Sequence, residues 1–182
     1  MSRIRHAQLN PNAPGARVRL RPWRMEDREL GLALFESNVP RYFAAAERPD
    51  FLTFLDDMPG PYFMLESMDG EALGCGGYAG GGEDPSVAFL CWGMVRGDLH
   101  GRRLGQRLLS ERLAQIAAEP VFETVIIETT QYSCGFFAHY GFVETTRVPD
   151  GFAPGMDRVD MTLQLDTYRH AMSTVEIAAP ST

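Results

Sequence analysis

Cysteine is scarce in this chain of 182 residues, and its three cysteines, Cys75, Cys91 and Cys134, lie far apart. An odd number of widely separated cysteines does not make a disulfide framework, and no Cys-x-x-Cys pair is present to begin a zinc site. We therefore expect no bound metal and a reducing, cytoplasmic location.

The chain also has fewer basic than acidic residues and lacks long apolar runs. The formal net charge is -7, which disfavours nonspecific attraction to nucleic acid or to an anionic membrane, because both require a cationic surface. Residues 1–16 contain a few basic residues with no apolar run behind them, so we predict a flexible arm there rather than a signal peptide or membrane span. An anionic ligand must then be held by a local group of basic residues.

Length and composition fit one globular domain. With 45% hydrophobic and 23% charged residues, the chain can bury a core, but it is too short for a second full domain. We place the domain at residues 17–165. The tail, residues 166–182, lacks sustained periodicity, so we expect it to be disordered or to form a surface helix.

Strand patterns and helical patterns follow one another along the domain. Alternating or β-branched apolar runs, with an Asp69-Gly70 turn between two of them, predict strands, and apolar residues spaced by three and four predict helices. The predicted strands are residues 18–21, 62–67, 72–78, 87–95, 121–128, 142–148 and 158–165. The predicted helices are residues 26–37, 51–58, 105–119 and 132–139. This order predicts an α/β fold with one mixed, mostly antiparallel sheet of about seven strands flanked by about four helices.

The segment most informative about function joins the predicted strand at 87–95 to the next helix. A glycine-bearing loop before a helix directs backbone N–H groups at one point, where the positive helix end also favours an anion such as a pyrophosphate. Gly101 and Gly105 allow close backbone approach, and Arg102 and Arg103 add cationic contacts. The residues alone leave two interpretations open, a pyrophosphate site or a solvated basic loop before an ordinary helix.

Two motifs carry a resemblance to a known family. The run His100-Gly101-Arg102-Arg103-Leu104-Gly105 resembles the pyrophosphate loop of the GNAT family of N-acetyltransferases, Gln/Arg-x-x-Gly-x-Gly/Ala. Phe136-Phe137-Ala138-His139-Tyr140-Gly141-Phe142 resembles the family's Phe-Tyr-x-x-x-Gly-Phe signature. The element order agrees over residues 17–165. Arg103 stands where the family has a glycine, so we expect negative φ there, the conformation that residues with side chains favour.

The resemblance implies the acyl-CoA N-acyltransferase fold and an enzyme that transfers an acetyl group from acetyl-CoA to an amine of a small molecule or peptide. It implies that the two strands flanking the loop and its helix splay apart, and that the pantetheine arm between them pairs with backbone like an added strand. The implied cofactor-binding residues are Met94, Val95, His100, Gly101, Arg102, Arg103, Leu104, Gly105, Gln106 and Phe136. Family members are often dimers, so a homodimer is compatible with the resemblance.

Candidate catalytic residues follow from the same comparison. The strand at 87–95 contains no carboxylate, so Glu128 at the end of the next strand is the candidate general base, with an ordinary solvated carboxylate as the alternative. Phe137 replaces the tyrosine that protonates the leaving thiolate in the family. Three functions therefore stay open: an N-acetyltransferase, a non-catalytic acyl-CoA-binding or regulatory module, and a plain interaction domain that binds no CoA. The resemblance assigns acceptor recognition to residues 38–58 and 147–157.

Overall fold

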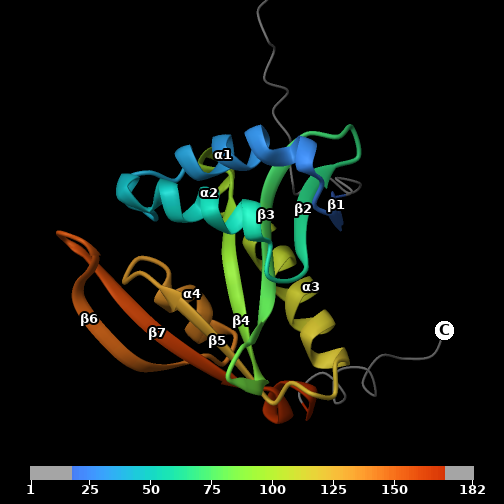
Figure 1. Cartoon of the computed structure of the whole chain (residues 1–182), viewed down its shortest axis with the longest axis vertical. Coiled ribbons are helices and arrows are strands. Elements are labelled where there is room, and N and C mark those ends of the chain that lie inside the picture. The colour runs from blue at the N-terminus through green and yellow to red at the C-terminus, as the bar shows by residue number, and fades with distance from the viewer. Residues whose placement is uncertain (1–17, 171–182) are drawn as a thin grey trace, which may run out of the picture.

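The computed structural model describes residues 18–170, which form a seven-stranded sheet in the order β1-β2-β3-β4-β5-β7-β6 (Figure 1). The strands are β1 (Val18–Pro22), β2 (Tyr62–Ser67), β3 (Ala72–Gly81), β4 (Asp84–Val95), β5 (Thr124–Thr129), β6 (Val143–Ala153) and β7 (Met156–Gln164). Every neighbouring pair is antiparallel except β4 and β5. The predicted fold class is confirmed.

The sheet is accompanied by the helices α1 (Arg28–Glu36), α2 (Arg48–Asp57), α3 (Leu104–Ala118) and α4 (Cys134–His139). Single turns of 3-10 helix precede α1, α2 and α3. Residues 165–170 are also helical. The predicted arm at 1–16 and the tail beyond residue 170 lie outside the described residues.

The hairpin of β3 and β4 is longer than its sequence pattern predicts. Gly80 pairs with Ala88 and Gly81 with Asp84, although the strand predicted from the sequence ends at residue 78. Gly82 alone has the positive φ, 61°, of a turn residue. The difference arises because a partner strand supplies hydrogen bonds that extend pairing through glycines of low strand propensity.

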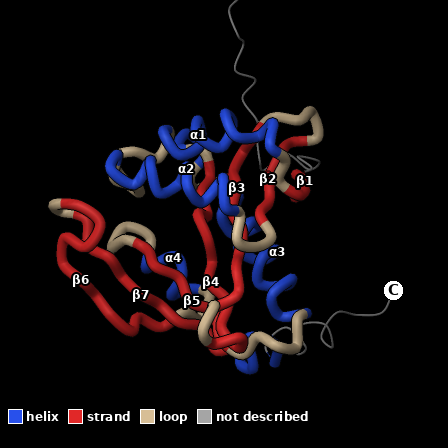
Figure 2. The backbone as a smooth tube through the Cα atoms, viewed as in Figure 1, coloured by secondary structure: helices blue, strands red, loops and turns tan. Residues whose placement is uncertain are grey.

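Helices cover both faces of the central strands β3 and β4. The side chain of Cys75 packs in a cluster with Phe35 of α1 and Phe51 of α2, whereas the next residue, Gly76, faces Arg112 of α3. Successive strand residues point to opposite faces, so α1 and α2 lie on one face and α3 on the other. Figure 2 shows α1 and α2 side by side, with α3 apart from them. No helix within residues 18–170 combines the length and apolar character needed to cross a membrane.

A buried ion-pair cluster, the Arg21 cluster, joins β1 and β2 to the turn before α1. Arg21 contacts Asp27 at 2.6 Å and Glu66 at 2.7 Å. The hydrogen bond from Arg21 holds the pKa of Asp27 below its usual value. Burial by itself would raise the pKa of Glu66, but hydrogen bonds from Arg21 and Arg19 outweigh it and lower that pKa.

The sheet opens between β4 and β5. These strands pair only at their beginnings, from Val87 opposite Thr124 to Phe89 opposite Ile126, and β5, β7 and β6 then turn away from β4 (Figure 1). A bulge in β4 follows, where Trp92 has a positive φ of 40°. A bulge bends its strand and increases the local twist. The expected splay of these two strands is therefore present.

Candidate functional site

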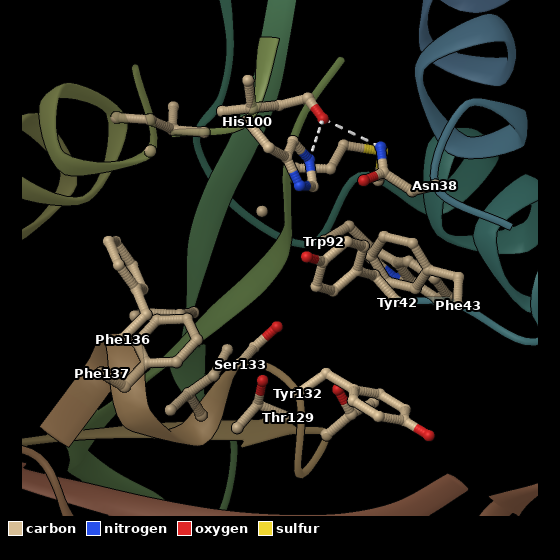
Figure 3. A pocket seen from close by; sticks show the side chains of 18 of the residues that line it. Asn38, Tyr42, Phe43, Trp92, His100, Thr129, Tyr132, Ser133, Phe136 and Phe137 are labelled. Atoms are coloured by element: carbon tan, nitrogen blue, oxygen red, sulfur yellow. Dashed lines mark hydrogen bonds between the residues drawn. The ribbon is translucent and has the colours of Figure 1, made fainter. Parts of the chain in front are cut away.

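A cavity of about 950 Å³ occupies the gap between β4 and β5. Its walls come from both faces of the sheet, with contributions from the segment between α1 and α2, the loop before α3, α4 and the β6–β7 hairpin. In Figure 3, Phe136 and Phe137 lie across the cavity from Tyr42, Phe43 and Trp92. The cavity thus connects a basic loop with an aromatic wall.

The loop before α3 takes a left-handed conformation at two positions. Gly101 has φ 77° and Arg103 has φ 62°, so the expected negative φ at Arg103 is wrong. A left-handed conformation costs a residue with a side chain about 1–2 kcal/mol. It is kept here because it turns the chain directly into α3, whose first residue is Leu104. The leading N–H groups of a helix have no partner within it, so those of α3 are available to an anion in the cavity.

The end of β4 is fixed by two side chains that contact one carbonyl oxygen. Asn38 Nδ2 lies 2.9 Å and His100 Nε2 lies 3.0 Å from the carbonyl oxygen of Val95 (Figure 3). The Asn38 amide also donates to the carbonyl of Leu34 at 2.8 Å. The ring of His100 is thereby held against the end of β4, next to Tyr42. Nothing in the sequence pattern marks Asn38.

The register of β3 and β4 decides which backbone groups face the gap. The N–H of Arg96 donates to the carbonyl of Leu73 at 2.9 Å, and hydrogen-bonded pairs alternate along antiparallel strands. The backbone of Met94 is therefore directed at Cys75 in β3, and that of Val95 is directed into the gap. The resemblance implies that the backbone of both Met94 and Val95 pairs with a ligand in the gap, but only the backbone of Val95 faces the gap. Met94 is buried and still lines the cavity.

The other predicted cofactor-binding residues converge, apart from Arg102, which is not part of the cavity lining. A Cβ atom built on Gly105 would lie 3.7 Å from the ring of Phe136 and 4.0 Å from Val95. The loop, α4 and β4 therefore meet at this glycine. The lining includes His100, Gly101, Arg103, Leu104, Gly105, Gln106 and Phe136.

The candidate base, Glu128, and the residue in place of the family's tyrosine, Phe137, both line the cavity. Glu128 is exposed there, and its neighbour Ile127 packs into the core beside α3, so strand alternation directs Glu128 toward the face covered by α1 and α2. Phe137 is buried against Phe142, with ring centroids 5.6 Å apart. It offers no proton donor.

Both segments expected to recognise an acceptor reach the cavity. Tyr42, Phe43 and Glu47 come from residues 38–58, and Phe152 comes from residues 147–157. Burial raises the pKa of Glu47, although its carboxylate accepts a hydrogen bond from the N–H of Ala44. Trp92 also lines the cavity, and its ring packs against Phe51 of α2 beside the bulge in β4.

Comparison with protein families agrees with this architecture. The family model described as "Acetyltransferase (GNAT) family" matches residues 31–142, well over half of the chain. The chain belongs to the GNAT family. A search of curated proteins found no match.

Solved structures share the GNAT fold with this chain. A GNAT-family structure from Desulfovibrio desulfuricans has a TM-score of 0.70 and 18% identity, and the match covers 82% of this chain and 99% of that chain. The structure of yncA from Salmonella typhimurium, solved with its cofactor acetyl-CoA, has a TM-score of 0.65 and 17% identity, and the match covers 91% of this chain and 99% of that chain. The spermidine/spermine N-acetyltransferase SpeG from Vibrio cholerae has a TM-score of 0.63 and 13% identity, and the match covers 85% of this chain and 96% of that chain. At these identities the likeness shows the fold alone.

Proposed function

We propose that the protein is an N-acetyltransferase that moves the acetyl group of acetyl-CoA directly to an amine of a small molecule or peptide. The observation that carries this proposal is one cavity lined from both faces of the sheet, with the α3 loop at one part and an aromatic wall at another. Two substrates that enter from opposite faces can meet in the gap, so proximity supplies much of the rate without a covalent enzyme intermediate.

The loop side of the cavity fits an acyl-CoA. The leading N–H groups of α3 and the guanidinium of Arg103 would hold the diphosphate, and the Val95 N–H would pair with the pantetheine arm as an added strand does. Phe136, exposed beside Gly105, offers an apolar contact to the same arm. When bound, acetyl-CoA supplies the acyl group as a thioester.

The aromatic side of the cavity fits a cationic amine. Tyr42, Phe43 and Trp92 supply aromatic rings, a residue type that attracts ammonium groups, and Glu47 and Glu128 add carboxylates to the same walls. An amine with a pKa near 10 must lose a proton before attack, which requires about 4 kcal/mol at neutral pH. Glu128 is the group that accepts this proton, directly or through water.

A non-catalytic acyl-CoA-binding or regulatory module is the second candidate, favoured by one observation. Phe137 stands where the family resemblance implies a tyrosine acid, and its buried ring cannot donate a proton. A CoA thiolate, with a pKa near that of cysteine, about 8.5, can nevertheless leave without a dedicated acid. The loss of the tyrosine therefore lowers the rate in the first candidate and abolishes catalysis only in the second.

Calorimetric titration with acetyl-CoA, followed by an amine screen, separates the candidates. We expect micromolar binding to the intact chain and much weaker binding to the Arg102→Ala/Arg103→Ala double variant. Release of free CoA thiol with polyamines, aromatic amines or peptide N-termini would establish the transferase. Binding without thiol release across the whole screen would favour the regulatory module, and no binding at all would refute both.

A further inference from the structure

A buried arginine lines the cavity without a negatively charged partner. Arg112, in the third turn of α3, is 3% exposed. Its Nε donates to the carbonyl of Leu108 at 3.2 Å and its Nη1 to that of Gly77 at 3.4 Å, both long contacts. Among residues 18–170, no carboxylate pairs with Arg112, and no acceptor receives a hydrogen bond from Nη2. A buried guanidinium normally has such partners.

The sheet is built to make room for this guanidinium. A Cβ atom on Gly93 would lie 2.7 Å from both Nη1 and Nη2, and one on Gly76 would lie 3.1 Å from Nη1. These glycines lie in adjacent strands, and Gly93 directly follows the bulge residue Trp92. Gly76 and Gly93 thus have no side chain at the point where β4 separates from β5, and the charged end of Arg112 occupies the space.

The surroundings leave the positive charge uncompensated. The titratable groups whose charges act on the pKa of Arg112 are Tyr62 of β2, Cys91 of β4 and Cys75 of β3. Burial raises the pKa of Tyr62 well above its usual value, and it raises the pKa of Cys75 to about 12 and that of Cys91 to about 11. Burial also lowers the pKa of Arg112, to about 10. At neutral pH the three neighbours are therefore neutral and Arg112 is a cation.

We propose that Arg112 stabilises the negative charge on the CoA sulfur during acyl transfer, and so takes over the electrostatic part of the role that a tyrosine at position 137 would have. The inference rests on the proposed function. When the bond between the amine nitrogen and the acyl carbon forms, the carbon–sulfur bond breaks and the sulfur keeps the electron pair. The nitrogen gives up its proton through Glu128 to water, and the thiolate later takes a proton from water. Arg112 remains protonated throughout.

A cation beside the sulfur predicts a measurable property of bound CoA that does not depend on turnover. The thiol of CoA bound to the wild-type protein, titrated by the ultraviolet absorbance of the thiolate, should have a pKa at least about one unit below its value near 8.5 in solution. Arg112→Met, which keeps an unbranched apolar side chain but removes the charge, should return that pKa to its solution value. Arg112→Lys should retain part of the shift. Arg107→Met is the matched control, because Arg107 lies on the same helix but is exposed and paired with Glu111.

Stability and rate add readouts that a purely structural role would move differently. Removal of a buried, unpaired charge is neutral or stabilising, so the melting temperature of ligand-free Arg112→Met should equal or exceed that of the wild type. Its kcat should fall by about 10²–10³-fold, with little change in the Kd for CoA. An Arg112 that merely supports the fold would instead lower the melting temperature in Arg112→Met and leave the thiol pKa unchanged.

The outcomes separate this inference from the proposed function. If CoA binds the wild type but its thiol pKa is not lowered, or is lowered equally in Arg112→Met, the role of Arg112 is refuted and the transferase proposal stands. If CoA does not bind the wild type, the proposed function itself fails. Should Arg112→Met not fold, the wild-type titration and Arg112→Lys still decide the question.

Discussion

Replacing Arg103 with glycine is expected to stabilise the protein and to weaken its proposed binding of acyl-CoA at the same time. Arg103 has a φ of 62° and a ψ of 8° immediately before α3, a conformation that glycine adopts without steric cost. Arg103 also lines the cavity, where its guanidinium would hold the diphosphate. Arg103→Gly therefore removes backbone strain and a cation of the cavity lining in one step.

The two effects have different sizes. The left-handed conformation costs an L-residue about 1–2 kcal/mol, and the extra freedom of glycine in the unfolded chain offsets about 0.5–1 kcal/mol of that. A net gain of about 0.5–1 kcal/mol raises the melting temperature by about 1–4 °C in a chain of this size. Loss of a charge-assisted contact of about 1.5–3 kcal/mol raises the Kd for acetyl-CoA about 10- to 150-fold.

Thermal unfolding without ligand and calorimetric titration with acetyl-CoA measure the two effects separately. Arg103→Ala removes the cation but keeps a side chain, so its affinity should fall without a rise in melting temperature. Arg102→Gly is the matched control for the backbone, because Arg102 does not have a positive φ, and that variant should lose stability. A lower melting temperature for Arg103→Gly than for the wild type would refute the reasoning.

Three further predictions follow from contacts in the structure. Asn38→Ala removes two buried hydrogen bonds and should cost about 1–3 kcal/mol in urea unfolding; a loss below about 0.5 kcal/mol would contradict its role at the end of β4. Glu128→Gln should lower kcat about 10²–10⁴-fold at neutral pH while the Kd for acetyl-CoA stays unchanged, and higher pH should recover activity as the amine deprotonates. The pKa values of Asp27 and Glu66 are lowered in the folded protein, so both carboxylates stabilise the fold at a pH above their unfolded-state pKa, near 4. Stability should therefore fall as acidification protonates these two carboxylates. Arg21→Met should remove most of this acid dependence, and an unchanged profile would count against the Arg21 cluster.

The sheet and its order of elements follow from the sequence because their signals are local. Alternating apolar residues, the Asp69-Gly70 turn and the helical spacing of leucines each depend on neighbours a few positions away. The same holds for the loop from His100 to Gly105, whose glycines and arginines are adjacent in the chain. Element ends were less well predicted, since the extent of β3, β4 and β6 depends on their partner strands.

The tertiary structure alone decided how the site is assembled. Asn38 holds the carbonyl of Val95 from 57 positions away, and Trp92 enters the cavity because a bulge opposite Gly76 rotates it. In the sequence, Arg112 is one of several polar residues on an amphipathic helix. In the structure, Gly76 of β3 and Gly93 of β4 make space for it. The sequence by itself determined which elements form and where the glycine-bearing basic loop before α3 begins. Only the tertiary structure determined which backbone groups face the gap and where an unpaired charge is buried, because these depend on register and on contacts between residues far apart in the chain.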